Sequence, residues 1–377
     1  MTQKTSILHR VIHFMRHDPV LTAALILAVV SSFFVPPSGA YLGYIDFHVL
    51  ALLFSLMLVV AGLQKSGAFT LLTDCLLRYV RSKRALAAVL VGVCFFTSML
   101  ITNDVALITF VPLSLMLLTR EDDQNLLMLV IVLQTIAANL GSGLTPLGNP
   151  QNLYLYSLAG MSLGEFLSVM LLPTLLSGVM LTTMILLIPT DKIERPVAET
   201  GEQLSVRKLV PWIILFGICL LSVLHVLHYI YMLAIVAAAI CVLDRTLLKK
   251  ADYNLLLTFV GFFVFIGNMK SIPAVSEMLS SLVAGRELMI GVLLSQVISN
   301  VPAAMLLSGF TSDFANLLLG VNLGGLGTLI ASMASMISFK IYAGAPGAKS
   351  GKYFLLFTAL NFVFLAILLL IMLLIAL

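Results

Sequence analysis

The sequence predicts an all-α polytopic membrane protein, and two observations support that fold class. First, 60% of the 377 residues are apolar and only 10% are charged, with a mean hydropathy of +1.11. Soluble domains carry about 25% charged residues, so this composition excludes a water-soluble enzyme, a nucleic-acid-binding protein and a disordered chain. Second, the apolar segments have the length of helices rather than of the alternating ten-residue strands of a barrel.

The order of the apolar segments predicts about nine full crossings and two hairpins, which gives 9–11 membrane helices. The first half has crossings at 20–36 and 45–64, an amphipathic segment at 66–80, a hairpin at 85–118, a broken helix at 125–162 and a crossing at 165–189. A polar linker at 190–208 and crossings at 209–227, 229–244 and 252–269 follow. A second hairpin at 288–318, a broken helix at 319–340 and a last crossing at 353–377 complete the chain. The arm lengths leave open whether the hairpins re-enter or span the membrane fully.

The distribution of lysine and arginine predicts the orientation. With residues 1–19 as a cytoplasmic N-terminal segment, 19 of the 21 basic residues fall on the cytoplasmic side, and only Lys270 and Arg286 fall outside. Because Lys and Arg concentrate in cytoplasmic loops, we expect the N-terminus inside and the C-terminus outside.

Short motifs recur in both halves in the same order. The matches are Gly62-Leu63-Gln64-Lys65-Ser66 with Gly267-Asn268-Met269-Lys270-Ser271, Ile101-Thr102-Asn103 with Ile298-Ser299-Asn300, and Asn139-Leu140-Gly141 plus Thr145 with Asn322-Leu323-Gly324 plus Thr328. Residues 20–189 and 229–377 are therefore predicted to be two repeats, joined by a linker and one connecting helix at 190–228. That single extra crossing inverts the second repeat, and inverted repeats are typical of secondary transporters.

Polar residues gather at the hairpin tips and helix breaks, where freed backbone groups must face protein or water. The predicted substrate- and ion-binding residues are Thr102, Asn103, Asp104, Asn139, Thr145, Asn149, Asn152, Ser299, Asn300 and Thr328. A charge at the bilayer centre costs roughly 3 kcal/mol, so a buried Asp104 would pair with a cation or carry a proton. If 85–118 spans fully, Asp104 is instead an ordinary aspartate of an outer loop.

Three of these segments resemble the ion transporter superfamily. They are Thr102-Asn103-Asp104-Val105-Ala106-Leu107 with Pro112, Leu144-Thr145-Pro146-Leu147-Gly148-Asn149-Pro150-Gln151-Asn152, and Ser295-Gln296-Val297-Ile298-Ser299-Asn300-Val301-Pro302. The group includes arsenite permeases, citrate-type permeases, sodium/proton antiporters and divalent-anion/sodium symporters. The sequence looks most like bacterial inner-membrane anion permeases with a citrate-transporter-like domain.

The resemblance implies a sodium site formed by Asn103, Asp104, Asn149 and Asn300. Dicarboxylate symporters of this group carry Ser-Asn-Thr at their hairpin tips, and their second broken segment contains Pro-Pro-Asn. Here Asp104 replaces a neutral residue and Val301 replaces the threonine, while 331–335 lacks Pro-Pro-Asn. An acidic tip is more like the arsenite and antiporter branches.

We therefore expect a secondary active transporter in the bacterial inner membrane rather than an enzyme. It would move a small anion or a metalloid oxyacid by an elevator-like motion, with Na⁺ or H⁺ as the coupling ion, Asp104 as the coupling residue and no other cofactor. The resemblance implies a homodimer in the lipid bilayer, and no nucleic-acid partner is expected. The alternatives are a sodium/proton antiporter without an anion substrate and a passive channel.

Overall fold

The computed structural model describes residues 18–78, 80–119, 123–193 and 206–376. Within these ranges the chain forms helices and no β-strand, with one isolated bridge between Ser82 and Lys192. The predicted all-helical class is confirmed. Residues 1–17 of the predicted N-terminal segment and residues 194–205 of the predicted polar linker lie outside the described ranges.

In the first half of the chain, the predicted broken helix at 125–162 is divided into two separate helices. The helices of this half are α2 (Pro19–Ser32), α3 (Ala40–Tyr44), α4 (Phe47–Lys65), α5 (Ala68–Leu77), α6 (Lys83–Thr97), α7 (Asn103–Thr119), α8 (Gln124–Gly141), η1 (Ser142–Leu144), α9 (Pro150–Ala159) and α10 (Leu163–Leu186). The break between α8 and α9 coincides with the glycines and the two prolines of 141–150. Pro150 takes the first position of α9, where a missing N–H leaves no intrahelical bond unmade.

The second half of the chain has shorter hairpin helices than the first. Its helices are α11 (Val206–Val223), α12 (Tyr229–Leu243), η2 (Arg245–Lys250), α13 (Tyr253–Lys270), α14 (Pro273–Val283), α15 (Glu287–Ile298), α16 (Asn300–Ser308), α17 (Phe314–Leu323), α18 (Met333–Ala343) and α19 (Ser350–Ala376). α14 was not predicted from the sequence.

Within the predicted second hairpin, 288–318, and the predicted second broken helix, 319–340, the helices end at other residues than predicted. α16 ends at Ser308, and α17 begins at Phe314. A polar turn separates them: the Thr311 hydroxyl donates to Glu287 (2.9 Å), and Asp313 caps α17. Apolar residues on both sides of this turn gave the appearance of one continuous helix. The hairpin is α15–α16, and the broken helix is α17–α18.

Five helices of the described residues are long and apolar enough to cross a membrane alone, and the bent pair α14–α15 would make six. The five are Phe47–Lys65, Gln124–Leu144, Leu163–Leu186, Tyr253–Lys270 and Ser350–Ile375. The predicted nine crossings stay a prediction, because other predicted crossings fall on shorter helices. The nine residues of α16 extend only about 14 Å, less than half of the hydrocarbon thickness. This length favours a hairpin that re-enters.

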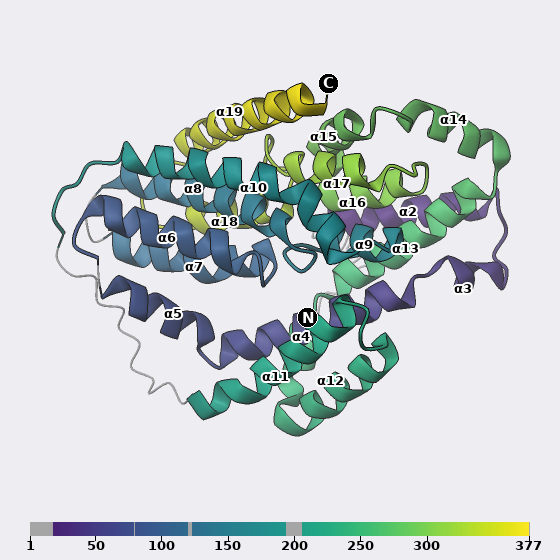
Figure 1. The fold of residues 1–377 in the computed structure, drawn as a ribbon, viewed down its shortest axis with the longest axis horizontal. Coiled ribbons are helices and arrows are strands. Elements are labelled where there is room, and N and C mark those ends of the chain that lie inside the picture. The colour runs from purple at the N-terminus through teal and green to yellow at the C-terminus, as the bar shows by residue number, and fades with distance from the viewer. Residues whose placement is uncertain (1–17, 79, 120–122, 194–205, 377) are drawn as a thin grey trace, which may run out of the picture.

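The helices form two parts. In the first, which we call the scaffold, α2 packs along α13, and α4 packs against α11 and α12. In the second, the hairpin part, α6, α7 and α10 surround α8, α15 packs on α17, and α18 contacts α7 and α8. Figure 1 shows α6 and α7 approaching the middle of the molecule from the left, and α15 and α16 from the right.

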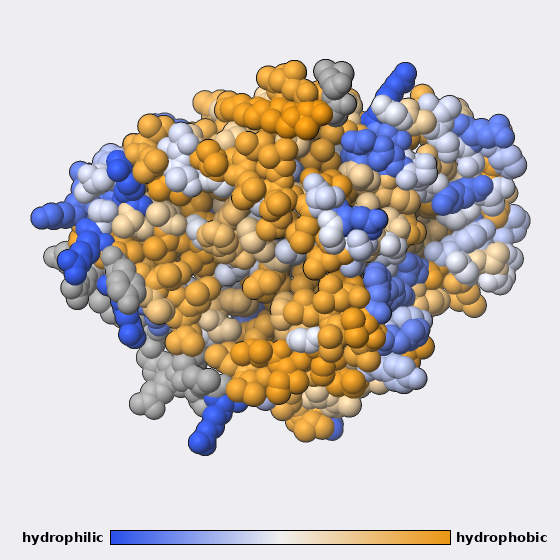
Figure 2. Space-filling model, viewed as in Figure 1, coloured by the Kyte–Doolittle hydropathy of each residue, from blue (hydrophilic) through white to orange (hydrophobic). Residues whose placement is uncertain are grey.

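The surface pattern suits a membrane protein. Figure 2 shows apolar side chains across the middle of one face and hydrophilic side chains gathered towards the ends of the long axis. The order of the helices in the two halves is compatible with the predicted inverted repeat. The orientation of the two halves in the membrane stays a prediction.

Two of the recurring motifs occupy equivalent structural positions. In the first, Ser66 and Ser271 end α4 and α13, and their N–H groups donate to the Gly62 and Gly267 carbonyls (3.0 and 3.1 Å). In the second motif, a glycine at the end of α8 and a glycine at the end of α17 each pack against a hairpin. A Cβ on Gly141 would approach Ser98 Oγ, and a Cβ on Gly324 would approach Ser295 Oγ, both at 2.7 Å.

The Gly141→Ala variant tests this close packing. The added methyl group would collide with the backbone carbonyl oxygen of Phe95, which cannot rotate away. We expect a loss of about 1–3 kcal/mol in stability, measured as a lower Tm of the purified protein in detergent. Gly92→Ala, on α6 of the same hairpin, is the matched control because no atom lies within 4 Å of its Cβ position. Equal Tm values for the two variants would contradict the packing.

Candidate substrate and ion site

The tip of the first hairpin is bonded to the break between α8 and α9. The Asn103 N–H donates to the Gly148 carbonyl (3.1 Å), and the Thr145 hydroxyl donates to the Met99 carbonyl. The Asn103 side chain donates to Asn139 Oδ1 (3.0 Å). These bonds satisfy groups that the helix break leaves without intrahelical partners. They therefore hold the start of α7 beside the start of α9.

The second tip is bonded to the second break in the same way. The Asn300 N–H donates to the Ala331 carbonyl (2.9 Å). The Thr328 N–H donates to Gln296 Oε1 (2.9 Å), and its hydroxyl donates to the Gln296 carbonyl (3.1 Å). Ser299 reverses the chain with a φ of +75°, a conformation that is rare for a residue with a Cβ. Local strain of this kind is common at functional sites.

Buried asparagines connect each half to the break of the other. Asn139, at the end of α8, accepts from the hydroxyl of Ser332, which begins α18 (2.9 Å). Asn322, at the end of α17, accepts from Asn149 (3.2 Å) and donates to Asn152 (2.6 Å) at the start of α9. The two breaks thus meet in the centre of the hairpin part.

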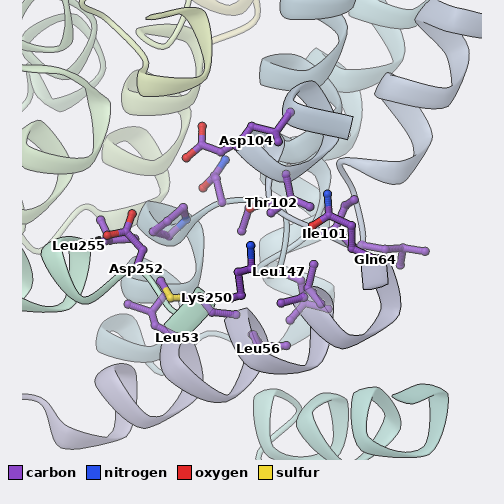
Figure 3. A pocket seen from close by; sticks show the side chains of 18 of the residues that line it. Leu53, Leu56, Gln64, Ile101, Thr102, Asp104, Leu147, Lys250, Asp252 and Leu255 are labelled. Carbon is purple, nitrogen blue, oxygen red and sulfur yellow. Dashed lines mark hydrogen bonds between the residues drawn. The ribbon is translucent and has the colours of Figure 1, made fainter. Parts of the chain in front are cut away.

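A cavity of about 650 Å³ lies between the scaffold and the hairpin part. From the hairpin part it is lined by Thr102, Asp104 and Asn149 among apolar neighbours, and from the scaffold by Gln64, Lys65, Thr246, Lys250 and Asp252. Figure 3 shows Asp104 on one side of this space, with Lys250 and Asp252 reaching towards it from the scaffold. The Lys65 side chain is 59% exposed, so the cavity reaches the surface at that end.

A second cavity, of about 20 Å³, is also lined by Asp104. A volume of this size holds about one water-sized particle. Its lining comprises Asn103, Asp104, Pro150, Gln151, Asp252, Leu255, Asn300, Val301, Ser332 and Met333. Asp104 Oδ1 and Gln151 Oε1 are buried and have no hydrogen-bond partner within the described part of the chain. Unpartnered buried oxygens are costly, and oxygen is the ligand that hard cations prefer.

The predicted site residues divide into two groups. Thr102, Asn103, Asp104, Asn149 and Asn300 line one or both of these cavities, and Ser299 lines a smaller neighbouring pocket. Asn139, Thr145, Asn152 and Thr328 hold the tips and breaks in place through the hydrogen bonds described above. Of the predicted sodium ligands, Asn103, Asp104 and Asn300 share the small cavity, whereas Asn149 lines the large one.

Several polar residues of the cavities were missing from the predicted set: Gln64, Lys65, Gln151, Thr246, Lys250, Asp252 and Ser332. Gln151 is 1% exposed and belongs to the same broken segment as Asn149, so its position in the motif could have indicated it. Lys250 ends η2 and Asp252 caps α13, about 150 residues after Asp104. No local pattern in the sequence brings them to the hairpin tip.

An ion pair stabilises the mouth of the large cavity. Lys65 Nζ lies 2.6 Å from Asp244 Oδ2. The hydrogen bond from Lys65, together with those from Thr246, lowers the pKa of the Asp244 carboxyl to about 2. Its contribution to stability is therefore present above the ordinary aspartate pKa and is lost only as the pH falls towards 2. Asp244 stays ionised near neutral pH, so it would not supply a pH-dependent step there.

Comparison with known proteins relates the sequence to membrane transporters. The family model described as "Citrate transporter" matches residues 11–316. Inner membrane protein YbiR of Escherichia coli is 32% identical over 335 residues, which cover 86% of this chain and 88% of YbiR. "Uncharacterized transporter MJ0456" of Methanocaldococcus jannaschii is 34% identical over 281 residues, or 73% of this chain and 75% of that protein.

A more distant similarity joins part of the chain to a plant protein. Silicon efflux transporter LSI3 of Oryza sativa is 33% identical over 143 residues, which cover 38% of this chain and 29% of LSI3. The expected relationship to the ion transporter superfamily is confirmed by these matches. The chain belongs to the citrate transporter family, and it is a membrane transporter rather than an enzyme.

Proposed function

We propose that this protein is a secondary transporter of the inner membrane that moves a small anion or a metalloid oxyacid, driven by a gradient of Na⁺ or H⁺. The observation that carries the proposal is the pair of cavities that share Asp104. One has the volume of a single ion, and the other has the volume of a small molecule. Two ligands bound there would be neighbours.

The position of Asp104 supports coupling between the two ligands. Its Oδ1 is buried without a hydrogen-bond partner in the described chain, so the ionised carboxylate lacks compensation. A negative substrate in the large cavity would be repelled: two like charges 4 Å apart cost about 4 kcal/mol at an effective dielectric constant of 20. A cation or proton bound at Asp104 removes that repulsion. Binding of the cation therefore favours binding of the anion, which is the requirement for symport.

The polar groups of the large cavity suit a small oxygen-rich substrate. Thr102 and Asn149 offer a hydroxyl and an amide, and α7 and α9 begin at Asn103 and Pro150. Helix N-termini carry partial positive charge, which favours an anion. The matching family model is described as citrate transporter, and the rice relative is named a silicon efflux transporter. Both chemistries fall within the proposed class.

The location of the large cavity supports alternating access. It lies between the scaffold and the hairpin part and reaches the surface beside Lys65. The hydrogen-bonded tips and breaks belong to the hairpin part and form one connected network. In the proposed elevator-like motion, this part moves against the scaffold and exposes its polar residues to each side of the membrane in turn.

Sodium/proton antiport without an anion substrate is the second candidate. The small cavity supports it, because two carboxylates, Asp104 and Asp252, line the space of one ion. Such a pair could hold Na⁺ and a proton in competition.

The Asp104→Asn variant tests coupling. We expect it to lose gradient-driven transport, because an uncharged amide can neither bind a proton nor compensate a cation. Purified protein in liposomes on a solid-supported membrane would receive separate Na⁺ and pH jumps, with and without citrate, succinate, sulfate, phosphate and silicic acid. Glu277→Gln, which removes an exposed carboxylate on α14, is the matched control.

The wild-type response distinguishes the candidates. A current that needs a cation jump together with one of the anions, or pH-driven accumulation of silicic acid, supports the proposed transporter. Proton release driven by Na⁺ alone and indifferent to every substrate favours antiport. Coupled transport by Asp104→Asn at the wild-type rate would refute the coupling role.

The Gln151→Leu variant tests the small cavity as the cation site. The change removes a buried, unpartnered oxygen and keeps a similar volume. We expect the KM for the coupling cation to rise about tenfold, because the loss of one ligand weakens cation binding by about 1.4 kcal/mol. Because the lost oxygen makes no hydrogen bond in the described chain, the Tm should fall little. An unchanged cation KM would place the cation elsewhere.

A further inference from the structure

We propose that Lys250 selects ionised substrates at the side of the membrane where the large cavity opens. The inference rests on the proposed transport function and names its substrate class: an anion rather than a neutral oxyacid. It assigns the selecting charge to the scaffold and not to the hairpin tips.

Lys250 is placed to meet a substrate. It is the last residue of η2 and lines the large cavity. In Figure 3 its side chain extends from the scaffold into the space below Thr102 and beside Leu147. The ammonium makes no hydrogen bond or ion pair with any of the described residues, whereas the other lysine of the cavity, Lys65, is bound to Asp244 (2.6 Å).

The neighbouring aspartate does not neutralise this charge. Asp252 Oδ1 accepts the Leu255 N–H (3.0 Å) as the cap of α13, and its side chain also lines the small cavity with Asp104. In Figure 3 the Lys250 and Asp252 side chains both extend from the scaffold into the space below Asp104. Asp252 lines the large cavity too, but it forms no ion pair with Lys250 within the described part of the chain, so the ammonium stays available to a substrate.

The surroundings of Lys250 strengthen its effect on an anion. Lys250 is exposed where the cavity opens, but most of the other residues that line the cavity are apolar, and apolar walls screen a charge less than water does. A lysine ammonium is a compact point charge that attracts carboxylate, sulfate or phosphate groups without demanding one geometry. A neutral oxyacid gains little from it. Selection by charge follows from this difference in attraction.

The location of Lys250 on the scaffold makes the effect one-sided. Thr102 and Asn149 travel with the hairpin part, but Lys250 does not. A contact between the substrate and Lys250 that forms in one conformational state raises the affinity for the substrate in that state alone. Lys250 should therefore lower the KM for the anion on the side of Lys65 and Lys250, which the charge distribution predicts to be cytoplasmic.

The test compares Lys250→Gln with Lys249→Gln in everted and right-side-out membrane vesicles. Lys249 belongs to the same turn, is exposed and does not line the cavity, so its variant makes the same change in net charge. Uptake of radiolabelled citrate, succinate, sulfate and phosphate, and of neutral silicic acid, is measured with the driving gradient established above. Tm values of both variants check folding.

For Lys250→Gln we expect the anion KM to rise about tenfold in everted vesicles and to stay unchanged in right-side-out vesicles. Lys250→Arg should restore the wild-type anion KM, and Lys249→Gln should have the same KM as the wild type. High salt should reduce the difference in KM between Lys250→Gln and the wild type. An equal rise on both sides, or an equal effect of Lys249→Gln, would overturn the inference. A wild type that carries silicic acid alone would overturn it and leave the proposed transporter intact. Coupled transport of none of the five probes would contradict the proposed function itself.

Discussion

Broken helices inside a membrane leave backbone and side-chain polar groups that lipid cannot satisfy, and the centre of this protein is arranged around that constraint. Each hairpin tip donates a backbone N–H to a carbonyl of the break beside it, from Asn103 to Gly148 and from Asn300 to Ala331. Asn139 and Asn322 then join the two breaks. Once these groups are paired within the protein, the few oxygens left without partners stand out as candidates for ligand contact.

The sequence predicted the helical class, the break between Gly141 and Pro150 and the polar tips, because glycine, proline and intramembrane polar residues have strong local consequences. It did not predict where the helices of the second hairpin end, because apolar residues on both sides of the 309–313 turn hid that turn. It also could not separate binding from structural roles: Asn139 and Asp104 look alike as buried polar residues, and only their partners distinguish them. Lys250 and Asp252 escaped because tertiary packing alone brings them to the tip.

The charges around the two cavities come from different parts of the molecule. Asp104 belongs to the hairpin part, while Lys250 and Asp252 belong to the scaffold. Relative motion of the two parts would therefore change the electrostatic surroundings of a bound ligand without any change in its immediate hydrogen-bond donors. A transporter built in this way can bind the same substrate with unequal strength on the two sides of the membrane. In the proposed motion, the polar breaks would supply the recognition that is common to both states.

The exchange of asparagines between the halves also has a consequence for biogenesis. During synthesis Asn149 and Asn152 leave the ribosome well before their partner Asn322, which lies about 170 residues later in the chain. Until it arrives, the Asn149 and Asn152 amides already have partners within the first break, among them Ser142, and Asn152 Oδ1 is the group that waits for Asn322. The first break can therefore take shape early, whereas the hydrogen bonds that join the two breaks can form only after the second half has been inserted.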